Sequence, residues 1–401
     1  MPRGILSKQN ARGVGKTTTQ ALLSPKMQRS KGALARSRSI DHQLDEEREL
    51  RQKEIQLLIL GGASSGKSTF IKQLRIHHGD GFPSRERATL RPHVHENIVE
   101  GIHTVTEHLP QFNITLQSPS TQNYLIEFKK KLPRINHFHH PVHENGSDGS
   151  PILERPASPV SPMVPRVKEM PNSMIEIIRD SGFQKCLAEH KTFERQLTVA
   201  EKHFLDNIER VVSKGYIPTL QDILYIRKPT TGVQEHTFHV NGLNYRVIDV
   251  AGQRSQRKKW IHFFDGVTAV IFFASLSGFN EALEEEHSIN NLRDSLITFQ
   301  DLSTNSFLEK TDFILFLNKE DLFKEKMQTV QLKDTFSEFK GENTPEAGLS
   351  FIKQEFMRLK RSSKQVYTHV TTATNMDVMK TIIRDVLQII VEINLKKTTV
   401  F

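Results

Sequence analysis

The residues best suited to chemistry form a glycine-rich stretch, which reads Gly61-Gly62-Ala63-Ser64-Ser65-Gly66-Lys67-Ser68. It matches the pattern G-x-x-x-x-G-K-[ST] and lies between an apolar run and a helical pattern. Backbone N–H groups of such a loop surround a polyphosphate, while Lys67 reaches the outer phosphates and the Ser68 hydroxyl ligates Mg²⁺. An ordinary glycine-rich turn is the alternative, but the flanking elements favour a phosphate-binding loop, which we extend to Thr69.

A second stretch is suited to reading a base. Asn318-Lys319-Glu320-Asp321 follows the apolar run 313–317. At the carboxyl end of a strand, the Asp321 carboxylate can accept both N1–H and the exocyclic amino group of guanine, a pairing that adenine cannot make. After the last predicted strand, the backbone amides of 371–374, with Ala373 among them, are placed to meet the guanine oxygen. Alone the motif would fit a helix cap, but its position predicts guanine recognition.

Two further stretches carry groups for phosphoryl transfer. In Asp249-Val250-Ala251-Gly252-Gln253, we expect Asp249 to hold Mg²⁺ through water, the Gly252 N–H to approach the γ-phosphate and Gln253 to orient the attacking water. Upstream, Arg227-Lys228-Pro229-Thr230 offers Thr230 as a second Mg²⁺ ligand and Arg227 as a cation over the transferring phosphoryl group. Taken singly, Arg227 would more often be a surface charge. The predicted catalytic set is Gln253, Arg227 and Lys67.

Alternating strands and helices must position these groups. Apolar runs predict strands at 54–60, 237–240, 245–249, 267–274, 313–318 and 366–371. Helical periodicity predicts a helix at 68–77 and a final helix at 377–395. The core positions expected on the final helix are Val378, Ile382, Ile383, Val386 and Ile390. This alternation is typical of an α/β fold with a mostly parallel sheet.

A long helical stretch interrupts this alternation. Residues 79–225 show a helical pattern and stand between the first helix and the second strand of the sheet. Within them, 133–171 is rich in proline, serine and glycine, which indicates a disordered loop. Upstream, 41–56 has mixed charges at helical spacing and is predicted to be an exposed helix.

The charge distribution excludes a basic nucleic-acid-binding body. The chain has 401 residues and a formal net charge of +9, with 55 basic and 46 acidic side chains. Residues 1–40 hold nine of the basic side chains and no acidic one, so the rest of the chain is neutral. We interpret 1–40 as a disordered basic tail and expect no nucleic-acid partner. A single cysteine, Cys186, and the lack of a long apolar run favour a cytoplasmic protein.

In their order and amino-acid sequence these four stretches resemble a heterotrimeric G-protein α subunit. The resemblance covers most of 41–401, and the large helical insertion separates it from small Ras-like switches. It implies a Ras-like P-loop GTPase domain, formed by 54–78 and 226–401, with an inserted all-α domain at 79–225. It also implies nucleotide contacts from Asp180 and Ser181, and adds to the expected nucleotide-binding set the residues Leu224, Tyr225, Ile226, Lys228, Pro229, Val250 and Glu320.

The resemblance further implies a GTP-hydrolysing switch with Mg²⁺ and GTP or GDP as ligands. The helix 41–56 and the segment 253–264 would dock a βγ dimer, and 394–401 would meet a seven-helix receptor. The amino-acid sequence at 255–257, 264–266 and 371–373 is most similar to the twelve/thirteen class, which signals to Rho exchange factors. Because position 2 is Pro2 and residues 1–185 contain no cysteine, we expect the basic tail, rather than acyl chains, to hold the protein on the anionic inner face of the plasma membrane.

Two departures from the family pattern bear on hydrolysis. Ala63 stands where the family has glycine, and its Cβ is expected to point toward the space shared by Gln253 and the attacking water. Ser64 replaces a glutamate that would pair with Arg227, which predicts a freer arginine. Slow hydrolysis is therefore a hypothesis, and a GTP-bound scaffold that does not hydrolyse is the alternative. An ATP-dependent phosphotransferase is a third reading, which Asp321 argues against.

Overall fold

The computed structural model describes residues 54–131, 172–190, 197–360 and 365–398. The predicted basic tail 1–40, most of the predicted helix 41–56 and the predicted loop 133–171 lie outside these residues. Three residues of the predicted helix, 54–56, are described, and at the last two the prediction is wrong. Ile55 and Gln56 belong to the first strand, where Ile55 pairs with Tyr245 and Gln56 with Arg246. The overlapping prediction of a strand at 54–60 is confirmed for 55–60.

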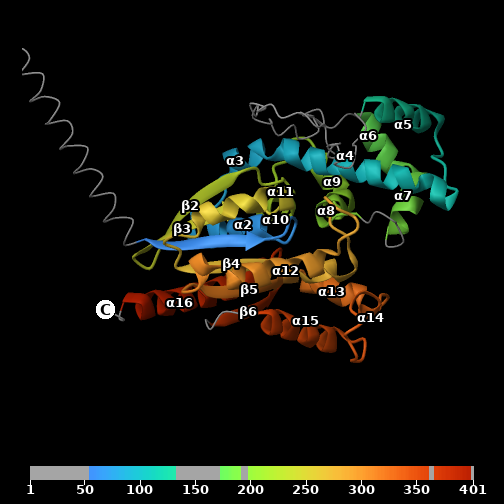
Figure 1. The fold of residues 1–401 in the computed structure, drawn as a ribbon. Coiled ribbons are helices and arrows are strands. Elements are labelled where there is room, and N and C mark those ends of the chain that lie inside the picture. The colour runs from blue at the N-terminus through green and yellow to red at the C-terminus, as the bar shows by residue number, and fades with distance from the viewer. Residues whose placement is uncertain (1–53, 132–171, 191–196, 361–364, 399–401) are drawn as a thin grey trace, which may run out of the picture. The chain divides into compact units, whose positions relative to one another are not determined.

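The described residues contain one six-stranded sheet with the order β2-β3-β1-β4-β5-β6 (Figure 1). Neighbouring strands are parallel except for β2 and β3, which form an antiparallel pair. The strands are β1 (Ile55–Gly61), β2 (Val233–Val240), β3 (Leu243–Val250), β4 (Ala269–Ser275), β5 (Asp312–Asn318) and β6 (Val366–Thr371). This confirms the predicted mostly parallel sheet.

The second strand is longer than predicted. Its first half, 233–236, is largely exposed and mostly polar, and it shows no apolar alternation. Pairing of this half with β3 fixes it as a strand, with Val233 opposite Val250. An edge strand can be polar because one of its sides has no neighbouring strand. By contrast, β4 and β5 are almost wholly buried, which fits the continuous apolar runs of central parallel strands.

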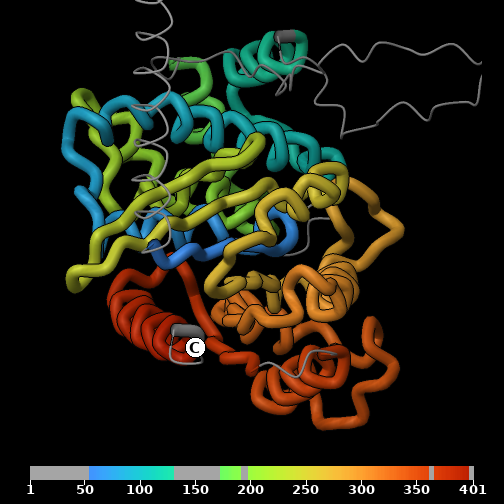
Figure 2. Tube along the Cα trace, turned by 60° about the vertical axis from the view of Figure 1, so that its left-hand side comes forward, coloured from blue at the N-terminus to red at the C-terminus, as the bar shows by residue number. Residues whose placement is uncertain are grey.

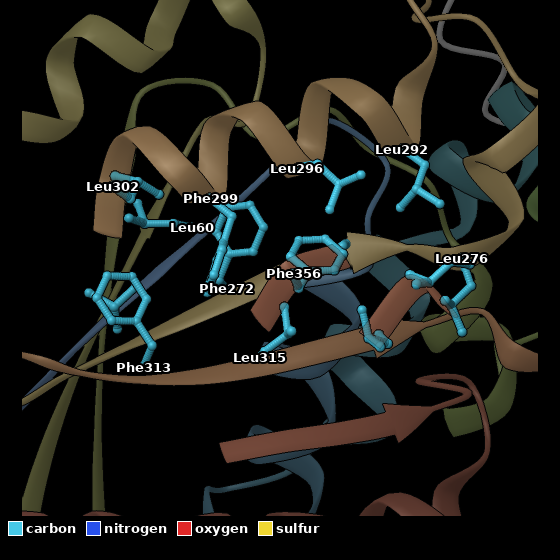
Figure 3. Packing of buried hydrophobic residues seen from close by; sticks show 14 of the residues in the cluster. Leu60, Phe272, Leu276, Leu292, Leu296, Phe299, Leu302, Phe313, Leu315 and Phe356 are labelled. Atoms are coloured by element: carbon cyan, nitrogen blue, oxygen red, sulfur yellow. The ribbon is translucent and has the colours of Figure 1, made fainter. Parts of the chain in front are cut away.

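Helices cover both faces of the sheet. The helices and 3₁₀ turns of this part are α2 (Lys67–His78), α11 (Arg254–Arg257), η3 (Lys258–Phe263), η4 (Leu276–Asn280), α12 (Asn291–Thr304), η5 (Ser306–Leu308), α13 (Glu320–Lys326), α14 (Leu332–Thr335), α15 (Pro345–Leu359) and α16 (Met376–Thr398). On one face, α12 and α15 pack against β4 and β5, and the Phe299 ring lies 5.4 Å from Phe272 and 5.3 Å from Phe356 (Figure 3). On the other, Phe70 of α2 lies 5.4 Å from Phe273.

The final helix packs with one stripe of its surface. Met379, Ile383, Val386 and Ile390 are buried at spacings of three and four residues. Val378 precedes this stripe by one position and is 46% exposed, so its predicted place in the core is wrong. Ile382 is partly buried against the same cluster.

The stretch between α2 and β2 is helical, as predicted, and has its own core. Its elements are α3 (Ser84–Thr89), α4 (Arg91–His108), η1 (Leu109–Phe112), α5 (Pro119–Lys131), α6 (Asn172–Arg179), α7 (Ser181–Ala188), α8 (Val199–Asp206), α9 (Ile208–Val211) and α10 (Leu220–Tyr225). In Figure 2 this stretch is coloured cyan to green, and along the chain it follows the blue α2 and precedes the yellow-green β2. Its buried cluster includes Ile98, Ile102, Phe183 and Phe204. No described helix is long and apolar enough to cross a membrane.

Candidate functional site

The glycine-rich loop joins the carboxyl end of β1 to the first turn of α2. Gly66, the residue before α2, has φ +108°, and a Cβ there would lie 2.1 Å from Asn318 Nδ2. Ser64 also has a positive φ, of 56°, and its side chain is exposed. The Ser65 hydroxyl donates to the Gly62 carbonyl at 2.9 Å. The loop is thus held in a tight turn at the N-terminus of a helix, where backbone N–H groups favour an anion.

Lys67 lies inside this turn. Its ammonium donates to the carbonyl of Gly61 at 2.8 Å and to that of Gly62 at 2.5 Å. Burial lowers the pKa of Lys67 to about 8, although the nearby Asp249 carboxylate opposes this shift. The two carbonyls are neutral, so a bound phosphate group would give the ammonium an anionic hydrogen-bond partner.

The magnesium ion fits a group of three side chains: Ser68 of α2, Thr230 of the segment before β2, and Asp249 of β3. The Ser68 and Thr230 hydroxyl oxygens are 2.9 Å apart. Asp249 is 1% exposed, and its Oδ1 has no hydrogen-bond partner among the described residues. Burial raises the pKa of Asp249 to about 6, against the opposing effect of Lys67. Hard oxygen ligands with room for phosphate and water suit Mg²⁺. The described residues contain no cluster of three or more His, Cys, Asp or Glu side chains for another metal.

The segment after Asp249 lies directly against the phosphate loop. A Cβ at Gly252 would lie 2.4 Å from Lys67 Nζ and 2.5 Å from the Gly61 carbonyl oxygen, so only glycine fits. Gln253 follows as the N-cap residue of α11. Beyond it, the indole N–H of Trp260 donates to the Ala251 carbonyl at 3.0 Å. The predicted hydrolysis segment and the predicted phosphate loop therefore form one site.

Arg257 fastens the same segment to α12. Its guanidinium donates to Asp294 Oδ2 at 2.6 Å and to the Thr298 hydroxyl at 2.7 Å. It also donates to the Gly252 carbonyl at 3.2 Å. One side chain thus ties Gly252, which lies against Lys67, to a helix that covers the sheet.

The predicted base-reading residues meet the phosphate loop through Asn318. Its Nδ2 donates to the Ser65 carbonyl at 2.8 Å, and its Oδ1 accepts from the Thr371 hydroxyl at 3.1 Å and the Ala373 N–H at 2.9 Å. The Ala373 amide therefore bonds Asn318 here, and its contact with guanine stays a prediction. The exposed Asp321 carboxylate accepts from the Thr372 hydroxyl at 3.3 Å.

Lys319 stands beside Asn318 in the left-handed region, with φ 63°. Burial lowers its pKa, and Arg227 and Glu284 are among the charges that act on it. Glu320 begins α13. The base-reading stretch thus lies near the arginine expected to contact the transferring phosphoryl group.

Arg227 is held by two residues that the sequence motifs do not include. Its backbone N–H and C=O both bond the side-chain amide of Asn97, at 3.0 and 3.1 Å. Its Nη2 donates to both carboxylate oxygens of Glu284 at 2.6 Å. The expectation of a freer arginine is therefore wrong, because Glu284 supplies a carboxylate in place of the one missing at Ser64.

Comparison with known families agrees with this geometry. The family model described as the G-protein alpha subunit matches residues 34–390. The chain belongs to the G-protein alpha-subunit family. It is accordingly a guanine-nucleotide-binding signalling switch, in a family whose members are generally GTPases and typically use magnesium, βγ dimers and receptors.

Two residues of this alpha subunit that were predicted to contact the nucleotide, Asp180 and Ser181, belong to the helical stretch. Asp180 is bonded within that stretch. The Asp180 carboxylate accepts from the N–H groups of Gln117, Ser118 and Gly182 and from the Thr121 hydroxyl. These donors all belong to the helical stretch, where Asp180 also caps α7 and Ser181 begins that helix. A nucleotide contact by Asp180 or Ser181 stays a prediction, and the structure shows Asp180 in a structural role.

The linker residues before Thr230 are mixed in exposure. Leu224 and Ile226 are buried, so nucleotide contacts there would use the backbone. Tyr225 stacks on His203 with ring centroids 3.9 Å apart, whereas Lys228 and Pro229 are exposed. Val250 and Ala251 are buried at the end of β3. Asn97 and Glu284, which hold Arg227, were not predicted because no motif spacing marks them. The signal in the sequence is a polar Asn97 beside the apolar Ile98 in a helical pattern.

Proposed function

We propose that this alpha subunit binds GDP and GTP with Mg²⁺ and hydrolyses GTP at the site formed by 61–69, 224–230, 249–253, 318–321 and Ala373. The observation that carries the proposal is the buried Asp249, whose Oδ1 has no hydrogen-bond partner within the described part of the chain and whose carboxylate interacts with Thr230, itself paired with the Ser68 hydroxyl. Ser68 and Thr230 are the proposed ligands of Mg²⁺, and Asp249 holds it through water. The bound ion would neutralise phosphate charge.

The chain's own groups would divide the remaining work. Lys67 exchanges the two loop carbonyls for outer phosphate oxygens, and the Gly252 N–H donates to the γ-phosphate. Gln253 orients the attacking water. Arg227 leaves Glu284 and places its guanidinium over the transferring phosphoryl group, where charge develops.

Guanine recognition is tested by Asp321→Asn. The carboxylate accepts two N–H groups of guanine, and an amide presents a donor that repels the exocyclic amino group but suits the oxygen of xanthine. We expect GTP affinity to fall by at least about tenfold and xanthosine triphosphate affinity to rise. Equilibrium binding of labelled analogues measures both, and an unchanged preference for GTP would show that Asp321 does not read the base.

A slow or non-hydrolysing GTP-bound scaffold is the second candidate, and Ala63 is the residue that favours it. The test is single-turnover hydrolysis of bound GTP by the natural protein and by Ala63→Gly. If the Ala63 methyl group obstructs Gln253 and water, the variant is faster by about tenfold or more. Equal rates would remove Ala63 as a cause of slow hydrolysis.

The partners follow from family membership as proposals. A βγ dimer docks on the segment 253–264 and on the helix expected before Ile55, and a seven-helix receptor contacts 394–401. We also propose that a GTPase domain is formed by 54–78 and 226–401, with 79–225 as a domain inserted between them.

We propose that the protein belongs to the twelve/thirteen class and has a Rho exchange factor as its effector. Binding of a purified Rho exchange factor only in the GTP-analogue state would support the class, and binding independent of nucleotide would oppose it.

The basic segment 1–40 is the proposed membrane contact, at the cytoplasmic face of the plasma membrane. Nine positive charges without an acid would bind anionic lipid at roughly 1 kcal/mol per basic residue near the surface. Co-sedimentation with phosphatidylserine vesicles should be lost without 1–40 and should weaken with salt. Binding that salt does not change would contradict an electrostatic contact.

A further inference from the structure

The backbone of Arg227 is fixed by one side chain from the helical stretch. Asn97 lies on α4, is 2% exposed, and uses both halves of its amide. Its Oδ1 accepts from the Arg227 N–H at 3.0 Å and its Nδ2 donates to the Arg227 carbonyl at 3.1 Å. Asn97 thus satisfies the backbone N–H and C=O of Arg227, as an adjacent strand in a sheet would. Since a buried amide left without partners is costly, this contact is expected to persist.

The guanidinium of Arg227 is held differently. Its carboxylate partner, Glu284, has a side chain that is 59% exposed, and the Arg227 side chain is 31% exposed. An ion pair open to water is weak and is readily exchanged for another anion. Arg227 therefore combines a firmly held backbone with a side chain that can change partner.

The peptide group before Arg227 is anchored as well. The Lys72 ammonium, from α2, donates to the carbonyl of Ile223 at 2.9 Å and to that of Ile226 at 2.7 Å. The helix α2, through Lys72, and the helix α4, through Asn97, thus hold the backbone groups at 226 and 227.

We propose that Asn97 is a positioning residue for Arg227. It fixes the arginine backbone as a pivot, so that the guanidinium swings between Glu284 and the transferring phosphoryl group without the chain moving. This inference rests on the proposed GTP hydrolysis and adds that α4, far from the motifs in sequence, sets the geometry of its arginine.

The test compares Asn97→Ala and Asn97→Asp with Thr104→Val in the full chain loaded with GDP or GTP. Thr104 is fully buried on the same helix, and its hydroxyl donates to the Glu100 carbonyl, so Thr104→Val removes a buried polar group without touching Arg227. Asp at position 97 can accept from the Arg227 N–H but cannot donate to its carbonyl.

Two readouts separate positioning from general stability. Trypsin cleavage after Arg227 should be faster in Asn97→Ala than in Thr104→Val, because the scissile backbone has lost its anchor. Single-turnover GTP hydrolysis should fall by about 10- to 100-fold in Asn97→Ala and by less in Asn97→Asp, while affinity for a non-hydrolysable GTP analogue is unchanged. If the natural protein hydrolyses too slowly to measure, the series is made in the Ala63→Gly background.

The outcomes distinguish this inference from the function on which it rests. If no background binds GTP or hydrolyses it, the proposed function fails and the positioning role falls with it. If the parent hydrolyses GTP and Asn97→Ala hydrolyses it equally fast, the positioning role is overturned and the function stands. A loss of hydrolysis equal to that of Thr104→Val would likewise show that Asn97 serves the stability of α4 only.

Discussion

Asp222 shows how a single buried carboxylate supports the approach to the site. It is fully buried, caps α10 as part of a capping box, and accepts from four side chains or backbone groups, those of His203, Arg210, Tyr216 and Thr219. Burial alone would raise the pKa of Asp222, but these hydrogen bonds hold it well below the ordinary 3.8. Since α10 leads into Arg227, this carboxylate stabilises the linker as well as the helical core.

We predict that Asp222→Asn lowers the free energy of unfolding by roughly 3–5 kcal/mol at pH 7, because the variant leaves Arg210 partly unpaired beside a buried amide. A pKa lower in the folded state stabilises the fold above the unfolded value of 3.8, and that stability is lost as the pH falls through the acid range. The difference between natural protein and variant should therefore shrink below about pH 4.

Urea unfolding at several pH values measures this difference. Asp206→Asn is the matched control, because Asp206 pairs with Lys202 at the surface and its side chain is 48% exposed. It should change stability by less than about 1 kcal/mol. A cost for Asp222→Asn as small as that of the control would contradict the account of Asp222.

At the scale of elements, the segment 249–263 is fitted to the phosphate loop as a unit. Gly252 lies against Lys67, Arg257 ties the segment to α12, and Trp260 bonds the carbonyl just before Gly252. The presence or absence of the γ-phosphate is therefore expected to change the position of the whole segment. Order gained from γ-phosphate contacts is a known physical basis of such switches.

We predict that Gly252→Ala binds GDP but does not undergo the change induced by a GTP analogue. The added Cβ would meet the Gly61 carbonyl oxygen at 2.5 Å and the Gly62 carbonyl carbon at 2.7 Å, which are backbone atoms and cannot turn aside. The segment must move away from the loop. Resistance to trypsin of the 254–263 segment, with GDP and with the analogue, measures the change.

Gly62→Ala is the control for this variant. A Cβ at Gly62 would meet nothing closer than 3.9 Å, so this substitution should keep the response to the analogue. A normal response from Gly252→Ala would contradict the close fit of the segment to the loop.

Prediction from the sequence is possible where information is local, and the mostly parallel sheet predicted from apolar runs is confirmed. The roles of the loop 61–68, the stretch 249–253 and Asn318 in nucleotide binding stay predictions, but these residues were identified from their spacing and neighbouring strands. Contacts made by fold alone were not: Asn97 and Arg227 are separated by 130 positions, and only the packing of α4 brings them together. The first half of β2 was missed for a similar reason, since pairing with β3 rather than its own composition makes it a strand.

At the scale of the whole molecule, the described residues form two hydrophobic cores on the faces of the sheet and a third in the helical stretch. The site residues come from both kinds of structure, because Arg227 is bonded by Asn97 of α4 and by Glu284 of the sheet part. A nucleotide-dependent change that moves the Arg227 guanidinium away from Glu284 would therefore take place beside an Arg227 backbone that the helical stretch holds.

The central claim, a switch driven by guanine nucleotide, is tested most directly by the fluorescence of Trp260. It is the only tryptophan of the chain, is 3% exposed, and bonds the Ala251 carbonyl next to Gly252. Replacing GDP by a non-hydrolysable GTP analogue with Mg²⁺ should change its emission, while an ATP analogue should have no effect and Trp260→Phe should abolish the signal. Unchanged emission despite measured binding of the GTP analogue would contradict the account.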